Sequence, residues 1–162
     1  MPTLFQAEAD HGDSIREVER GIRDATVEYL AVFTEMGFKL AEVTNFDTGS
    51  IYQSKKLKAI TKEHPGCIKL HNHPGTDDLP FSSTDIYTAM VDGESRTIVV
   101  TRSSVYEFVL PRRYTKREAK QARKLFEQNS GFTGNNRERR IHACELVAAE
   151  FGLTFKKSSW RD

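Results

Sequence analysis

Cysteine, tryptophan and long apolar segments are scarce in this chain of 162 residues, which has two cysteines and one tryptophan. Cys67 and Cys144 are too few for a disulfide scaffold and form no Cys-x-x-Cys pair, which favours a reduced, cytoplasmic protein. No segment approaches the roughly 18 consecutive apolar residues of a membrane helix. Residues 1–13 lack the basic and apolar regions of a signal peptide, so no membrane partner is expected.

The composition that remains is that of a globular domain. Hydrophobic residues make up 38% and charged residues 29% of the chain, and mean hydropathy is −0.56. The length suits one domain of about 100–200 residues, which is large enough to bury a core without disulfides.

The net charge of +1 conceals two regions of opposite sign. Residues 1–111 carry 11 Lys+Arg against 17 Asp+Glu, whereas residues 112–162 carry 13 against 6. Within the basic region Arg137, Arg139 and Arg140 could contact nucleic-acid phosphates or an acidic protein. Charged runs on helices are more often solvated faces, and this is the interpretation we favour.

The spacing of apolar residues alternates between helical and strand periods, which predicts an α/β or α+β sandwich with one shared core. No strand is predicted after Pro111. The predicted helices are 14–22, 51–63, 82–90, 115–128 and 137–151. The predicted strands are 26–34, 38–44, 67–70, 96–102 and 104–110.

Two histidines and an aspartate have the spacing of a metal site. His71 and His73 lie two apart at the end of a predicted strand, so their side chains point to one face. Asp85 follows in the first turn of the next helix, and the intervening loop is long enough to bring its carboxylate back to the imidazoles. Two nitrogens, one oxygen and an open fourth position are typical of a catalytic zinc site. Zinc there would lower the pKa of a bound water to about 7.

A hydrolase also needs a proton acceptor and an oxyanion donor. Ser82 precedes Asp85 by one helical turn, so its hydroxyl could donate a hydrogen bond to a carbonyl oxygen. Glu28 is the best candidate for the base, because strand alternation places it on the same face as apolar residues; Glu35 and Glu42 compete with it. Asp77 and Asp78 of the motif loop are predicted to be solvated turn residues.

The constellation resembles the signature of the JAMM (MPN-plus) metalloprotease family: a glutamate, then His-x-His-Pro, then Ser-x-x-Asp. These positions are Glu28, His71-Asn72-His73-Pro74 and Ser82-Ser83-Thr84-Asp85. The His-Asn-His-Pro form is also found in RadC-type proteins and many prokaryotic members. The resemblance spans roughly residues 14–110. It implies a cytidine-deaminase-like mixed sheet flanked by helices, here followed by two C-terminal helices.

The resemblance also implies roles for the five residues. Zinc would be held by His71, His73 and Asp85, with Glu28 as general base and acid and Ser82 as oxyanion stabiliser. Ser83 stays an alternative for that last role, because nine positions separate His73 from Ser82 where many members have eight.

Family members with all five residues are typically peptidases or isopeptidases, often removing ubiquitin-like proteins. We therefore expect a catalytic core at residues 1–111 and a basic helical extension at 112–162, packed on or appended to it. The substrate would be a protein or peptide, such as a ubiquitin-like C-terminal tail. The alternatives are a RadC-like DNA-associated protein, a phage-related processing protein and a non-catalytic scaffold.

Overall fold

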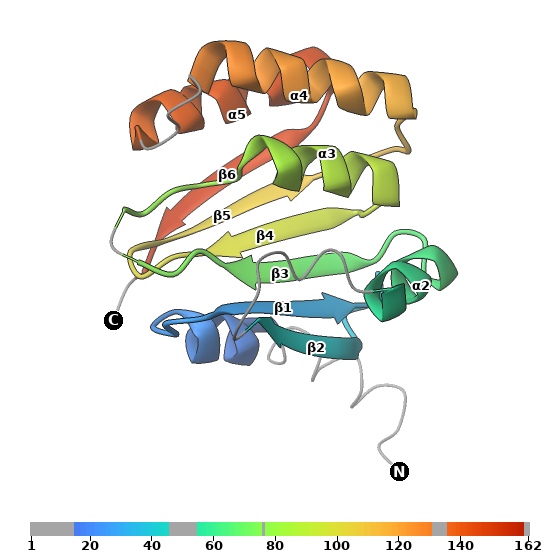
Figure 1. The fold of residues 1–162 in the computed structure, drawn as a ribbon, viewed down its shortest axis with the longest axis vertical. Coiled ribbons are helices and arrows are strands. Elements are labelled where there is room, and N and C mark those ends of the chain that lie inside the picture. Colours follow the sequence, from blue (N-terminus) through green and yellow to red (C-terminus); the bar gives the residue numbers. More distant parts are fainter. Residues whose placement is uncertain (1–14, 46–54, 76, 131–135, 161–162) are drawn as a thin grey trace.

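The computed structural model describes residues 15–45, 55–75, 77–130 and 136–160 and shows helices packed on a mixed six-stranded sheet (Figure 1). This confirms the predicted α+β class. The predicted positions 14 and 51–54 lie outside the described residues. The elements in chain order are a helix at 15–22, β1 (Glu28–Phe33), β2 (Lys39–Asn45), α2 (Lys55–Glu63), β3 (Ile68–Asn72), α3 (Ser83–Asp92), β4 (Arg96–Val100), β5 (Ser104–Val109), α4 (Lys116–Ser130), α5 (Arg137–Phe151) and β6 (Thr154–Ser159).

The strands lie in the order β2-β1-β3-β4-β5-β6, and only β3 and β4 are parallel. A parallel pair needs a crossover, and α3 provides it. All five residues of β3 are buried. The carboxyl end of β3 and the amino end of α3 are therefore joined by one short loop, a common place for ligands in sheets with parallel strands.

The sheet packs on both faces. On one face, Leu30 and Val32 of β1 meet α2, and the apolar residues of β4 and β5 meet α3, α4 and α5. On the other face, Ala31 and Phe33 pack with the helix at 15–22. The alternation along β1 follows from the two-residue period of a strand.

The prediction of no strand after Pro111 is wrong, because β6 pairs with β5 along its whole length. β6 is an edge strand whose side chains are mostly exposed, so it lacks the apolar alternation by which strands are recognised. Its two lysines, Lys156 and Lys157, are typical of edges protected against further pairing. Phe155 is the one partly buried side chain of β6, and its ring centroid lies 5.1 Å from that of Phe108.

Both predicted C-terminal helices are present as α4 and α5. They pack against α3 and β5 in one apolar cluster that includes Phe126, Cys144 and Val147. Residues after 111 thus supply two helices and an edge strand to the same core. None of the described helices is long and apolar enough to cross a membrane.

Candidate metal centre

The three predicted metal ligands meet where β3 ends and α3 begins. His71 is the fourth residue of β3, held between β1 and β4. His73 follows the strand, and its backbone N–H donates to the carbonyl of Val100, 2.9 Å away. Asp85 lies in the first turn of α3. Three separate backbone positions therefore direct their side chains to one point.

The donor atoms of these residues are spaced as metal ligands are. His71 Nε2 lies 3.2 Å from His73 Nε2 and 3.4 Å from Asp85 Oδ1, and His73 Nε2 lies 3.3 Å from Asp85 Oδ2. Ligands about 2.0–2.1 Å from a tetrahedral ion lie about 3.3 Å from one another, and the two imidazole nitrogens have this spacing. The Asp85 carboxylate turns one oxygen to each imidazole, and a set of one ligand atom from each residue lies within 4.8 Å. His71 and Asp85 are buried and His73 is partly exposed, which leaves one side open. The group could hold a metal ion.

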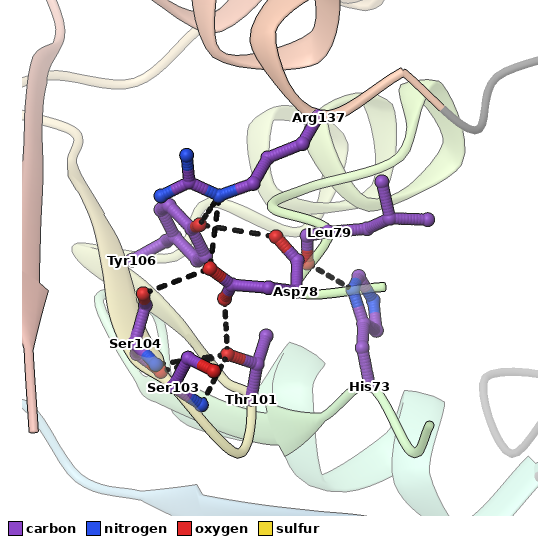
Figure 2. A network of polar contacts seen from close by, with 8 residues as sticks. All are labelled: His73, Asp78, Leu79, Thr101, Ser103, Ser104, Tyr106 and Arg137. Atoms are coloured by element: carbon purple, nitrogen blue, oxygen red, sulfur yellow. Dashed lines mark hydrogen bonds and ion pairs between the residues drawn. The ribbon is translucent and has the colours of Figure 1, made fainter. Parts of the chain in front are cut away.

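A backbone carbonyl orients His73. Its Nδ1 lies 2.9 Å from the carbonyl oxygen of Leu79 in the motif loop (Figure 2). A carbonyl can only accept, so Nδ1 carries a hydrogen, and Nε2 is the ring nitrogen that faces His71 and Asp85. Such a contact is the usual second partner of a metal-binding histidine.

The protonation of the site reflects the close approach of its groups. Burial opposes ionisation of Asp85, but the neighbouring His71 and His73 hold its pKa well below the usual value. Burial likewise disfavours the charged form of His73, yet its contacts with Asp85 and Leu79 raise its pKa. The opposite shifts of Asp85 and His73 have one cause, which is the direct contact between the carboxylate and the imidazole.

Ser82 caps α3 and contacts the third ligand directly. Its Oγ accepts from the backbone N–H of Asp85, 3.2 Å away, and its own N–H donates to Asp85 Oδ2, 2.8 Å away. This reciprocal pair is a capping box that also fixes the Asp85 carboxylate. The hydroxyl hydrogen of Ser82 remains available for donation. Ser83, the other candidate, is the first residue of α3 itself.

Glu28 begins β1, the strand that pairs with the histidine strand. The paired residues of β1 and β3 end at Leu30 and His71, and strand alternation puts Glu28 on the same face of β1 as Leu30. The side chain is half-buried. Among the described residues none forms a hydrogen bond or ion pair with this carboxylate.

The two competing glutamates lie elsewhere. Glu42 is paired with Ala31, which places it on the opposite face of the sheet, and it is exposed beside Lys39. The carboxylate of Glu35 lies against Gly66, before the start of β3 and at the far end from His71.

Asn72, which the sequence did not single out, ties the histidine strand to the glutamate strand. It is buried, its Oδ1 accepts from the N–H of Tyr29 at 2.7 Å, and its Nδ2 donates to the carbonyl of Val27 at 2.9 Å. These backbone groups flank Glu28, so Asn72 fixes the peptide segment from which that carboxylate projects. The only sequence signal was an amide between two histidines at a strand end.

The motif loop differs from prediction at Asp78. Asp77 is exposed as predicted, but Asp78 is half-buried and accepts hydrogen bonds from the turn after β4, from β5 and from α5. Two of the three arginines considered for phosphate contacts also face this loop. Arg137 Nε donates to Asp78 Oδ2 at 2.8 Å, and Arg140 Nη1 lies 3.5 Å from the carbonyl oxygen of Pro80.

The resemblance of the motif to a family rests on the sequence of the motif alone. No family model matches the chain, and searches of the curated proteins and of the solved structures found no match. The activity is therefore proposed from the site itself.

Proposed function

We propose that the protein is a zinc-dependent metallopeptidase or isopeptidase of JAMM type. The observation that carries the proposal is the convergence of His71, His73 and Asp85, with donor atoms 3.2–3.4 Å apart. Three protein ligands with one open side are typical of catalytic rather than structural zinc. The five-residue motif supports hydrolysis of a peptide or isopeptide bond.

Zinc bound there would supply a Lewis acid that polarises the scissile carbonyl and acidifies a water molecule. The chain supplies the remaining groups. Glu28 takes the proton from the attacking water and passes it to the leaving amine. Ser82 donates its hydroxyl hydrogen to the oxygen that gains negative charge. Asn72 and the capping box hold these two residues in place.

The proposed substrate is an extended segment of protein, such as the C-terminal tail of a ubiquitin-like protein. The sheet ends on two edge strands, β2 and β6, and edge strands can pair with an extended peptide. β2 lies next to β1, which carries Glu28. We place the activity in the cytoplasm, where thiols such as those of Cys67 and Cys144 stay reduced.

A DNA-associated role is less well supported, because part of the basic region is already paired within the molecule. Arg112 is bonded to Glu118 at 2.7 Å, and Arg137 is bonded to Asp78. These guanidinium groups would have to give up internal partners to neutralise phosphates.

The proposal is tested with zinc analysis and hydrolysis of ubiquitin-like proteins carrying C-terminal extensions. We expect one zinc per chain, retained in Glu28→Gln with loss of turnover, and loss of both zinc and turnover in Asp85→Ala. Glu42→Gln is the matched control and should behave as wild type. Absence of stoichiometric zinc, or full activity of Glu28→Gln, would contradict the proposal.

A further inference from the structure

Asp78 lies at the centre of a polar network that joins the motif loop to three other elements (Figure 2). Its Oδ1 accepts from Thr101 Oγ1 at 2.5 Å. Its Oδ2 accepts from Ser104 Oγ at 3.1 Å and from Arg137 Nε at 2.8 Å. Its backbone carbonyl accepts from the Tyr106 hydroxyl at 3.1 Å. Four residues distant in sequence thus hold one loop residue on both its side chain and its backbone.

The backbone conformation of Asp78 explains why these hydrogen bonds are needed. Its φ is 49°, the only positive value at a non-glycine position in the described residues. Side chains other than glycine disfavour this left-handed region, although aspartate tolerates it better than most. The network therefore stabilises a turn that the chain would not adopt unaided.

The turn at Asp78 directs the next carbonyl, that of Leu79, toward His73. As described above, this carbonyl is the acceptor for His73 Nδ1. The other two ligands have local support, since His71 lies within β3 and Asp85 belongs to the capping box. His73 lies beyond the end of its strand and depends on the loop for the orientation of its ring.

We propose that Asp78 is a positioning residue that sets the tautomer of His73 through the Leu79 carbonyl, with Arg137 of α5 securing it. The inference rests on the proposed metal centre. It makes the basic C-terminal region part of the support of that centre. Residues that orient metal-binding histidines usually change metal affinity by 10–100-fold when they are lost.

The first measurement is the tautomer of His73 in the metal-free protein, from nitrogen chemical shifts and proton couplings of its ring. Wild type should show hydrogen on Nδ1. Asp78→Ala should give a mixture of tautomers at His73 and leave the His71 signals in place. Asp77→Ala, one position away and exposed, is the matched control and should leave both histidines unchanged.

The second measurement is the affinity for Zn²⁺, by competition with a chromophoric chelator. We expect a loss of about 10–100-fold in Asp78→Ala and about tenfold in Arg137→Gln, with none in Asp77→Ala. Arg137→Gln lies at the start of a helix and keeps the test usable if Asp78→Ala fails to fold. Wild-type tautomer and wild-type affinity in Arg137→Gln and in folded Asp78→Ala would overturn the inference.

Different results would contradict the proposed function and the positioning role of Asp78. If wild-type protein bound no zinc, the proposed metallopeptidase activity would be contradicted, whereas the tautomer of His73 could still be measured. If the Asp78 and Arg137 variants bound stoichiometric zinc with unchanged affinity, the positioning role would be contradicted, and the proposed metallopeptidase function would not be.

Discussion

Two buried polar clusters lie on the same face of β3, only two residues apart. One surrounds His71, and the other surrounds Lys69, which is 2% exposed. Lys69 Nζ lies 2.6 Å from Asp92 Oδ2 and 3.1 Å from Glu94 Oε2. Burial disfavours the charged form of Lys69, yet these two carboxylates raise its pKa.

The clusters differ in what their atoms offer. In the Lys69 cluster one ammonium group meets two carboxylates, although Glu94 Oε1 is left without a hydrogen-bond partner. In the His71 cluster two imidazoles and a carboxylate bring together the atom types that a metal ion takes as ligands. A buried cluster that already contains its cation has a structural explanation, whereas one built from metal-ligand atoms could also hold an added cation.

The largest expected effect comes from removing the cation of the Lys69 cluster. Lys69→Met removes the cation that faces the buried Glu94 and the partly exposed Asp92, so we expect the free energy of unfolding to fall by about 3–5 kcal/mol in chemical denaturation. Zinc bound per folded chain should not change. Lys62→Met, at an exposed position of α2, should cost under about 0.5 kcal/mol. If Lys69→Met and Lys62→Met lowered the free energy of unfolding equally, a special role for Lys69 would be contradicted.

A smaller effect is expected from pH. Burial raises the pKa of Glu94 to about 7, above its ordinary 4.5, although Lys69 opposes this. Between these values the folded chain binds more protons than the unfolded chain, so the free energy of unfolding should fall as pH rises from 4.5 to 7.

The size of this fall should be about 1–3 kcal/mol, and Glu94→Gln should remove it. Denaturation at pH 5 and pH 8 measures it, with Glu138→Gln, at an exposed position, as the control. Lys69 stays protonated throughout this interval. If the free energy of unfolding of Glu94→Gln still fell between pH 5 and pH 8, the pH dependence would have to come from other titratable groups.

The smallest effect on stability is expected at the edge of the metal centre. Ser82→Ala removes the cap of α3 and should cost about 1 kcal/mol. If Ser82 also holds the oxyanion, the same change should lower kcat about 10²–10³-fold. Ser83→Ala should do neither. A loss of turnover in Ser83→Ala alone would transfer the oxyanion role to that residue.

What the sequence could predict was local. Helix periods and turn residues identified α3, α4 and α5, and the spacing of His71, His73 and Asp85 identified three ligands that do meet. Strand alternation made Glu28 a candidate, and only the resemblance to the JAMM motif chose it over Glu35 and Glu42. These signals depend on neighbours within a few positions, which one sequence displays directly.

What it could not predict depends on distant partners. β6 has no apolar alternation because its partner β5 lies on one side and solvent on the other. Asn72 and Asp78 look like ordinary loop residues until Tyr29 and Arg137 are brought to them. Arg137 was assigned to a charged surface, because nothing in a basic helix reveals that an aspartate 59 residues earlier accepts from it.

The separation of Asp78 and Arg137 along the sequence also affects when the loop can fold during synthesis. Chains are made from the amino end at about 5–20 residues per second, so Arg137 emerges roughly 3–12 seconds after Asp78. During that interval a nascent chain carries both histidines and Asp85 but lacks α5. The network around Asp78 is complete only after α5 has been made, so the proposed support of His73 is complete only when synthesis has moved well past the motif.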